Sequence, residues 1–290
     1  MDIDRAKLVI TGVFVGFAAL EFLLGRFLHR EGTTRKDVVI EAVCTLAIPV
    51  VFVPLILTGG TFLAELLAPQ SAGMLAHLPG WAMFAILLVG DDLTQYLWHR
   101  ASHTSWLYPL HRAHHSAPYM SVRLVYRNNL IYYLFMPGLW ISAMLVHWGF
   151  AEVYAVYILL KMTVIIGAHS SIPWDVPLYR WRWSRPLMWL VERVISTPAT
   201  HAAHHGLHPA DGVTHYAGNY GNFLFLWDVL FGTAHLTRRR PESFGIHGLE
   251  PVGLLNELLV PTPMRWVADA DPMSAVDSDR RPTCGTESME

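Results

Sequence analysis

Long apolar stretches dominate the first part of this 290-residue chain. Residues 8–28, 38–59 and 80–98 each hold about twenty mostly apolar positions, the length that a helix needs to cross a bilayer. Residues 130–168 are too long for one crossing, and His147-Trp148-Gly149 stands midway, so we expect a helical hairpin there. The pattern predicts an all-α integral membrane bundle of about four to five spanning helices.

Polar positions modify this picture at three places. Asp91 and Asp92 interrupt the third apolar stretch, where carboxylates are costly and commonly functional. Residues 174–197 mix tryptophan with arginine, a composition that favours the headgroup layer, so we expect this stretch to lie along the membrane surface. Residues 268–290 are polar and poor in apolar side chains, which predicts a disordered tail after a single membrane-embedded domain over residues 1–267.

Composition supports lipid as part of the solvent. The chain is 53% hydrophobic and only 15% charged, whereas a soluble domain carries about 25% charged residues. The net charge of −2 provides no basic field for nucleic acid, so we expect no such partner. The two cysteines, Cys44 and Cys284, form no CxxC motif, so thiol chemistry is not expected.

The distribution of basic residues predicts the topology. Arg26, Arg30, Arg35 and Lys36 follow the first stretch, whereas residues 59–80 contain no Lys or Arg. The positive-inside rule places the first loop in the cytoplasm. The third span then brings His99 to the cytoplasmic face, and the hairpin returns the chain to it. We therefore expect a multi-pass protein with a cytoplasmic histidine-rich helical cap and a cytoplasmic C-terminus.

Histidines cluster in two windows on this predicted face. Of sixteen histidines, five lie between His99 and His115 and five between His201 and His215. The first window contains HRASH and HRAHH, and the second begins with HAAHH. On a helix, positions i, i+3 and i+4 share one face, so each triplet directs several imidazoles to one region.

This arrangement predicts a metal site, because neutral imidazole is the commonest metal ligand among side chains. Adjacent histidines cannot point in the same direction on a helix, but they can serve two neighbouring ions. A doublet in each window therefore indicates a binuclear site. The candidate ligands are His99, His103, His111, His114, His115, His201, His204 and His205, with His169 as a ninth.

Taken as a set, these segments resemble the fatty acid hydroxylase superfamily, also called the sterol desaturase family. The resemblance is carried, in order over residues 91–233, by DDLTQYLWHRASH, LHRAHHS, GAHSS, TPATHAAHHG and NYGNFLFLWDVLFGT, within a histidine-motif region of about residues 85–235. It implies a membrane-bound, non-haem di-iron enzyme that uses O2 as co-substrate to attack an unactivated C–H bond of a lipid or other apolar molecule. It also implies that the nine histidines are the iron ligands.

Several alternatives stay open. Desaturation begins with the same hydrogen abstraction as hydroxylation, and the alkyl-ether-cleaving monooxygenases share the histidine pattern and use a pterin reductant. A membrane metal transporter or sensor is the rival of another class. No haem-binding segment is evident, so we expect an external electron donor of the ferredoxin or cytochrome type. Zinc binds histidine ligands tightly and can replace iron on purification.

A smaller set of residues is expected to support the ligands, because metal-bound histidine usually donates its other N–H to a carboxylate or carbonyl. The supporting candidates are Asp92, Asp228 and Asn219, with contact to a neighbouring helix as the alternative role of Asp92 and Asp228. His208 and His215 are weaker metal candidates, and His29, His77, His147, His235 and His247 are expected at the surface or interface.

Arg123, Tyr126 and Arg127 are candidates for contact with a polar substrate head or an electron donor, with a solvated loop as the alternative.

Overall fold

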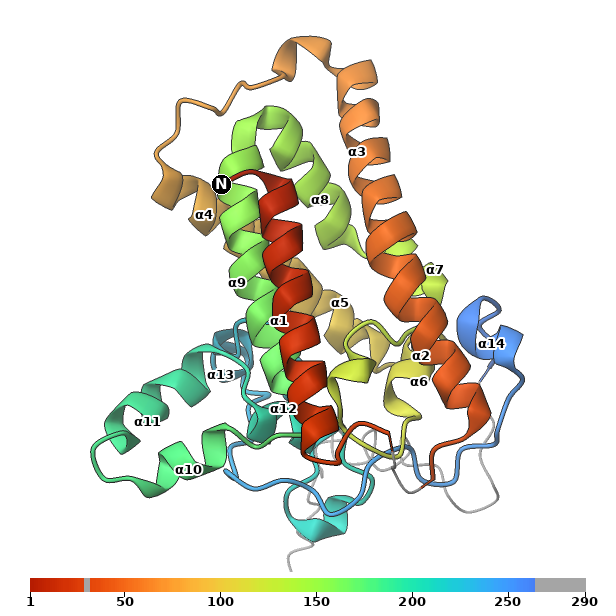
Figure 1. Ribbon diagram of the computed structural model, residues 1–290. Coiled ribbons are helices and arrows are strands. Elements are labelled where there is room, and N and C mark those ends of the chain that lie inside the picture. Colours follow the sequence, from red (N-terminus) through yellow and green to blue (C-terminus); the bar gives the residue numbers. More distant parts are fainter. Residues whose placement is uncertain (29–31, 264–290) are drawn as a thin grey trace, which may run out of the picture.

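Long helical limbs form the upper part of the molecule in the computed structural model, which describes residues 1–28 and 32–263 (Figure 1). Three of these limbs are single helices or continuous helical runs, and the last two form a hairpin. They are α1 (Ile3–Leu23); α2 (Arg35–Ala47), η1 (Ile48–Phe52) and α3 (Val53–Leu67); α4 (Gly80–Leu87), η3 (Leu88–Leu93) and α5 (Thr94–Ser102); α8 (Pro137–Leu145) with η5 (Val146–Phe150); and α9 (Ala151–His169).

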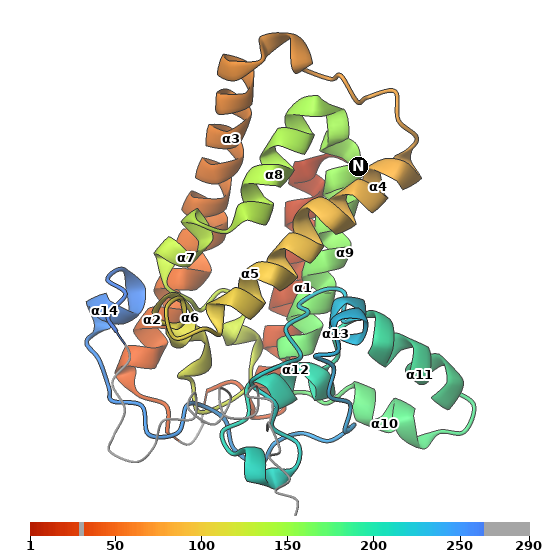
Figure 2. The same cartoon turned by 180° about the vertical axis from the view of Figure 1, so that it is seen from behind.

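Short helices gather at the opposite end of the bundle from the N-terminus (Figures 1 and 2). They are α6 (Tyr108–His115), η4 (Val122–Leu124), α7 (Leu130–Leu134), α10 (Asp175–Arg180), α11 (Arg185–Val194), α12 (Pro198–His204), η6 (Pro209–Asp211), α13 (Leu226–Phe231) and α14 (Leu254–Leu258). One further short helix, η2 (Pro69–Ser71), lies apart from these, between α3 and α4. The described residues contain no β-strand beyond two isolated bridges, so the predicted all-α class is confirmed.

Among the described residues, three helical segments are long and apolar enough to cross a membrane, namely Ile3–Leu23, Arg35–Leu67 and Pro137–His169. The span expected over residues 80–98 is not one of the three. The segment Pro137–His169 reverses direction at Gly149, whose φ of 110° interrupts the helix, so it supplies two limbs. A Cβ at Gly149 would lie 2.9 Å from the Cβ of Ala76, and therefore both the backbone angle and the close approach require glycine. The hairpin expected around His147-Trp148-Gly149 is thus present.

The limb formed by α4, η3 and α5 is one continuous helical run, and its central segment, η3, is π-helical. That segment contains Asp91 and Asp92, and both carboxylates are buried. Asp91 accepts hydrogen bonds from Lys161 (2.5 Å) and Tyr157 (2.6 Å) of α9. A buried charge is tolerated when it is paired in this way. The Asp91–Lys161 pair therefore holds α4–α5 against α9.

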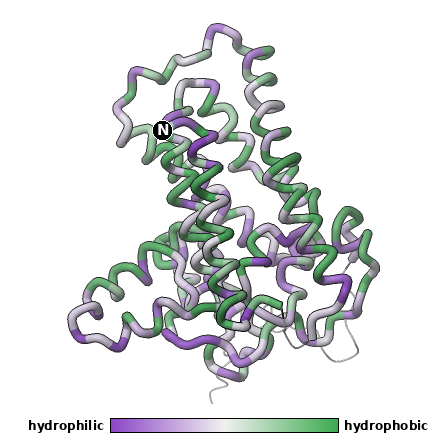
Figure 3. Tube along the Cα trace, viewed as in Figure 1, coloured by the Kyte–Doolittle hydropathy of each residue, from purple (hydrophilic) through white to green (hydrophobic). Residues whose placement is uncertain are grey.

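The limbs consist largely of hydrophobic residues (Figure 3). Leu8 and Leu23 on α1 and Phe62 on α3 each expose more than two thirds of their surface. Such large apolar faces are rare on soluble monomers and match a lipid environment. Together with the three candidate spans, they indicate an integral membrane protein.

Capping residues fix where the helices begin. Asp2 accepts the backbone N–H of Arg5 at the start of α1. Thr34 and Asp37 form a reciprocal capping box at the start of α2, and Thr197 and Thr200 form another at the start of α12. The second box matters for the site, because α12 carries His201 and His204 within its seven residues and His205 as its C-terminal cap.

Two expectations are not tested by the fold. Residues 174–197 contain α10, which ends at Arg180, and α11, which begins at Arg185, and their position along the membrane surface stays a prediction. The tail predicted at residues 268–290 lies outside the described residues. The single domain over residues 1–267 stays a prediction.

Candidate metal centre

Nine buried histidines from four helices converge into two adjacent groups. The five-histidine group contains His99, His103, His111, His115 and His204, and the four-histidine group contains His114, His169, His201 and His205. Within each group the candidate ligand atoms lie within 4.8 Å of one another. The structure therefore brings together all nine residues that the sequence singled out.

Helix ends supply most of these side chains. His99 lies near the end of α5 and His103 is its C-terminal cap, while His169 is the last residue of α9. The HxxHH triplets lie in α6 and at the end of α12, where positions i, i+3 and i+4 share a face. The site is consequently assembled where the long limbs meet the short helices (Figures 1 and 2).

Each histidine doublet is divided between the two groups. The rings of His114 and His115 lie at an interplanar angle of 85°, and those of His204 and His205 at 88°. As a result His115 and His204 enter the five-histidine group, whereas His114 and His205 enter the other. This is the geometry expected when neighbouring residues on one helix turn serve two different centres.

Backbone carbonyls fix the tautomers of four rings. The Nδ1 atoms of His99 and His204 lie 2.6 Å from the carbonyl oxygen of Tyr220 and 2.7 Å from that of Gly218, respectively. In the other group, the Nδ1 atoms of His114 and His169 face the carbonyl oxygens of Arg127 (3.0 Å) and Ile165 (2.8 Å). A carbonyl only accepts, so each Nδ1 carries the proton and each Nε2 presents a lone pair.

These Nε2 lone pairs face one another. The Nε2 atoms of His99 and His204 are 3.0 Å apart, and those of His114 and His169 are 3.4 Å apart. Neither contact can be a hydrogen bond between neutral rings, because both protons are already on Nδ1. Two nitrogen ligands about 2.1 Å from one ion lie about 3 Å apart, so a cation between the rings would convert repulsion into coordination.

Protonation of the rings does not remove the repulsion between the facing Nε2 lone pairs in the same way. Burial lowers the pKa of His204 and His114 well below the ordinary value, since the charged imidazolium loses its hydration. Burial also lowers the pKa of His115 and His205, and neighbouring imidazoles lower both further. In addition, His103 Nε2 is buried with no hydrogen-bond partner among the described residues. The donor set is thus neutral imidazole, which suits zinc, copper, iron and nickel.

Asp228 organises the loop that holds two of the rings. Its carboxylate accepts the backbone N–H groups of Tyr220 (2.8 Å) and Gly221 (2.7 Å) and the hydroxyl of Thr233 (2.6 Å). Burial raises the pKa of Asp228 to about 6. The carbonyls of Gly218 and Tyr220 in this loop accept the ring protons of His204 and His99. Asp228 therefore acts on the histidines through the backbone.

Asn219 stabilises the same loop from inside. It adopts a left-handed backbone conformation with φ of 55°, and its side chain donates to the carbonyls of Thr200 (2.9 Å) and His235 (3.0 Å). Its amide oxygen accepts the backbone N–H of His235. The link to Thr200 ties the loop to α12, one residue before His201.

Asp92 contacts no histidine among the described residues. Its carboxylate accepts hydrogen bonds from the indole N–H of Trp227 (2.8 Å) and the backbone N–H of Leu224 (3.3 Å). Of its two predicted roles, the geometry matches helix packing, because the contacts join η3 to the segment before and within α13.

Arg127 lies on the other side of the cluster and is fully buried. Its guanidinium donates to the carbonyl of Ala113 (2.6 Å) and to Asp37 of α2 (2.8 Å), and it lies 3.4 Å from Glu41. Arg123 is also buried and pairs with Glu41 at 3.4 Å. The expectation that these arginines lie in a solvated loop is wrong, and neither is exposed to meet an external donor.

Aromatic rings line the cluster and were missed by the sequence reading. Tyr132 stacks on His111 with a centroid distance of 5.1 Å and an interplanar angle of 19°, and Trp98 packs behind Tyr132 at 5.6 Å. Tyr220 packs against His103 at 5.1 Å, and Tyr108 packs against the same ring at 5.4 Å. They lie inside the first window or outside the two windows, at positions without a periodic pattern that could have identified them.

The remaining histidines stay outside both groups. His208 pairs with His247, with ring centroids 5.1 Å apart, and His215 pairs with His235 at 4.9 Å. His147 instead contacts Ser71 near the hairpin turn. His29 lies outside the described residues. Proximity in sequence to the second window did not bring His208 or His215 into the cluster.

Comparison with known proteins gives two kinds of match. Residues 84–233 match the family described as fatty acid hydroxylase. The alkylglycerol monooxygenase of Danio rerio is 29% identical over 175 residues, which cover 58% of this chain and 33% of that protein. The alkylglycerol monooxygenase of Xenopus tropicalis is 25% identical over 154 residues, which cover 51% of this chain and 29% of that protein. The matched regions thus span about a third of these relatives, and no solved structure matches the chain.

Proposed function

The chain belongs to the fatty acid hydroxylase family, and we propose that it is an O2-dependent hydroxylase in which each histidine group holds one iron ion. Its proposed substrate is a lipid or other apolar molecule with an unactivated C–H bond. Family and relatives indicate an oxidoreductase of the oxygenase type. The substrate, the iron and the electron donor are the proposed parts.

The single observation that carries the proposal is the facing pair of Nε2 lone pairs in each group. In the five-histidine group these belong to His99 and His204, and in the four-histidine group to His114 and His169. Two such pairs, in two groups that share the doublets, support two ions and not one. When bound, iron would supply the electron transfers that activate O2.

The chain's own residues would hold the centre rigid and dry. The carbonyls of Tyr220, Gly218, Arg127 and Ile165 retain the Nδ1 protons, so those rings present Nε2 as fixed ligands. The aromatic rings around the cluster exclude water. The limbs expose apolar faces, which would let an apolar substrate reach the enzyme from the bilayer.

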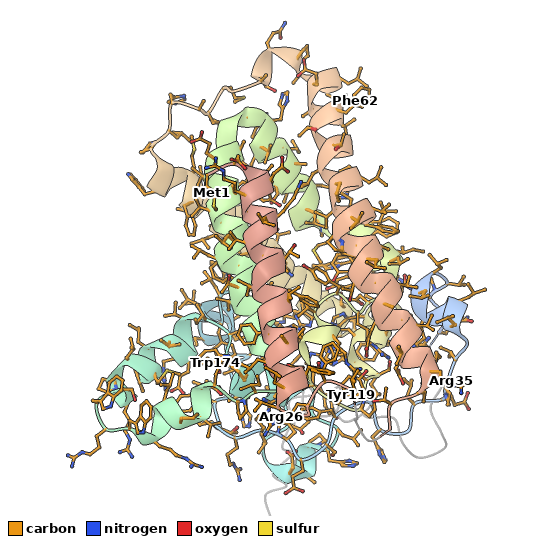
Figure 4. All side chains as sticks on the ribbon, viewed as in Figure 1. Met1, Arg26, Arg35, Phe62, Tyr119 and Trp174 are labelled. Carbon is orange, nitrogen blue, oxygen red and sulfur yellow. The ribbon has the colours of Figure 1, made fainter. Side chains whose placement is uncertain are left out.

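An electron donor and a membrane orientation complete the proposal. We propose an external donor protein of the ferredoxin or cytochrome type. Arg26 and Arg35 lie at the cluster end of the bundle, while Phe62 lies near the opposite end (Figure 4). By the positive-inside rule this supports a cytoplasmic cluster and C-terminus.

A second candidate is favoured by the names of the relatives. Both are alkylglycerol monooxygenases, and this supports an ether lipid as the substrate. The histidine pattern also resembles that of the alkyl-ether-cleaving monooxygenases, and this supports a pterin as the reductant. Hydroxylation of the carbon next to the ether oxygen uses the same proposed centre. Desaturation would also start there and differ only in the final product.

Product analysis under labelled oxygen tests the proposal. Membranes containing the protein would be incubated with a fatty acid, a sterol and an alkylglycerol under 18O2, with either a ferredoxin system or a reduced pterin. We expect one product that gains one 18O atom. Loss of two hydrogens without oxygen would identify a desaturase instead.

Matched variants make the assay specific for the cluster. His114→Ala removes a ligand from one group, and His204→Ala removes one from the other. His208→Ala changes an exposed histidine outside both groups and serves as the control. Turnover by the first two variants at the level of the control would overturn the proposed site.

A further inference from the structure

The α10–α11 arm (residues 175–194) projects sideways from the bundle at the end where the histidine-bearing helices lie (Figures 1 and 2). It is held to the body by few side chains. Met188 and Glu192, which are one helical turn apart, are the buried residues of α11. Residues 185–187, 189 and 190 of the helix are exposed.

The open surface of α11 is strongly apolar. Leu187 and Leu190 are 58% and 53% exposed and lie on a different face from Met188 and Glu192. Trp181, Trp183 and Trp189 are each at least half exposed. Removing apolar side chains such as leucine from water is favourable, so this exposure in water would forgo that stabilisation.

The charge of the arm has one sign. Residues 176–191 contain Arg180, Arg182 and Arg185 but no acidic residue. The flanking acids, Asp175 and Glu192, are buried, and Glu192 is bound by Arg238 (2.7 Å) and Arg193 (2.6 Å). The arm thus offers exposed arginine and tryptophan side by side with exposed leucine. That combination matches the interface of a bilayer with anionic headgroups.

The apolar surface continues onto a neighbouring element. α13 packs against α11 and exposes Val229, Leu230 and Phe231. Leu226 and Trp227, at the start of α13, pack into the hydrophobic core formed by α4, α8 and α9. The helix that carries these exposed side chains is therefore packed directly against the limbs.

We propose that the α10–α11 arm lies in the headgroup layer of the same bilayer that the limbs span. Leu187, Leu190 and the exposed side chains of α13 face the acyl chains, and the arginines bind anionic lipid headgroups. This inference concerns the membrane surface and does not depend on the proposed reaction.

The arm is also connected to the metal ligands. Immediately after α11, Ile195 forms a bridge with Leu224, and the N–H of Ser196 donates to the carbonyl of Phe223 (3.0 Å). The next residue, Thr197, caps α12, which carries His201 and His204. Anchoring the arm in the headgroup layer would therefore set the depth of the second histidine window below the membrane surface.

Spin-label accessibility tests this inference on the whole chain in lipid nanodiscs. Leu187→Cys and Leu190→Cys would each be labelled in a Cys284→Ser background, where Cys44 is buried. Ala210→Cys, at an exposed position of η6, is the matched control. Collision rates with O2, which concentrates in lipid, and with a water-soluble nickel chelate would be measured at each site.

We expect the labels at positions 187 and 190 to collide preferentially with O2 and the label at position 210 with the chelate. Adding phosphatidylglycerol to phosphatidylcholine discs should move the first two labels deeper. Chelate access at positions 187 and 190 equal to that at position 210 would overturn the proposal. Protection from both reagents would also overturn it, because protein, and not lipid, would then cover the arm. Neither result depends on metal content or turnover.

Discussion

His99 and His204 face each other through Nε2 atoms 3.0 Å apart, although each ring already donates its Nδ1 proton to a backbone carbonyl. Two like lone pairs at this distance repel unless a cation lies between them. The same relation joins His114 and His169 in the other group. The metal assignment rests on this paired geometry more than on the number of histidines.

The support from Asp228 leads to a first prediction. Asp228→Asn replaces an oxygen that accepts hydrogen bonds by an NH2 group that cannot, which leaves a backbone N–H of Tyr220 or Gly221 unpaired. We expect metal affinity to fall about 10- to 100-fold, as for partners of metal-bound histidines, and stability to fall by about 1–3 kcal/mol. Metal titration and thermal unfolding measure the two effects.

Asp211→Asn is the control for this change. Asp211 also accepts two backbone N–H groups, those of Val213 and Thr214, but it lies in a turn outside the cluster. We expect unchanged metal affinity in this variant. If both variants lost metal equally, Asp228 would have no specific role in holding the rings.

The buried arginine beside the first window leads to a second prediction. Arg127→Ala leaves the carboxylate of Asp37 without its arginine partner in a buried site, and Glu41 loses one of its two arginine partners. Breaking a buried pair costs about 3–5 kcal/mol, so we expect a large loss of thermal stability in detergent. Arg5→Ala removes an exposed pair with Asp2 and should cost no more than about 1 kcal/mol. Equal melting temperatures for the two variants would contradict the assigned burial of Arg127.

The hairpin turn leads to a third prediction. Gly149→Ala adds a Cβ 2.9 Å from Ala76 and forces a left-handed backbone angle on alanine. We expect destabilisation of about 1–3 kcal/mol, measured by thermal unfolding. Gly12→Ala in α1 meets no atom within 4 Å and should be neutral or stabilising by up to about 1 kcal/mol. A neutral Gly149→Ala variant would argue against this turn.

Local patterns were sufficient for the limbs and the ligands. The apolar stretches predicted the candidate spans Ile3–Leu23 and Arg35–Leu67, and Gly149 stands where the hairpin within Pro137–His169 was expected. The predicted span over residues 80–98 is not among the candidate spans of the described residues, and Asp91 and Asp92 lie at its centre. The HxxHH spacing predicted which residues share a helix face and that each doublet would divide. These features depend on residues within a few turns of one helix, so their spacing in the sequence determines them.

Contacts between distant segments were beyond such patterns. Arg127 and Asp37 are separated by ninety residues, and His99 and Tyr220 by more than a hundred. The sequence around Arg127 does not distinguish a buried ion pair from a solvated arginine. The sequence around His99 does not show whether its ring proton goes to a backbone carbonyl or to a carboxylate. For the same reason the sequence did not reveal the partner of Asp92, which lies two helical turns from His99 but contacts Trp227.

Metal content per chain tests the central claim most directly. Protein purified anaerobically from iron-supplied cells would be analysed by plasma mass spectrometry, alongside His204→Ala, His205→Ala and the control His208→Ala. We predict two metal ions per chain in the wild type and in the control, and a loss of about one ion in each of the other two variants. One ion or none in the wild type, or no loss in both ligand variants, would contradict a centre built from two histidine groups.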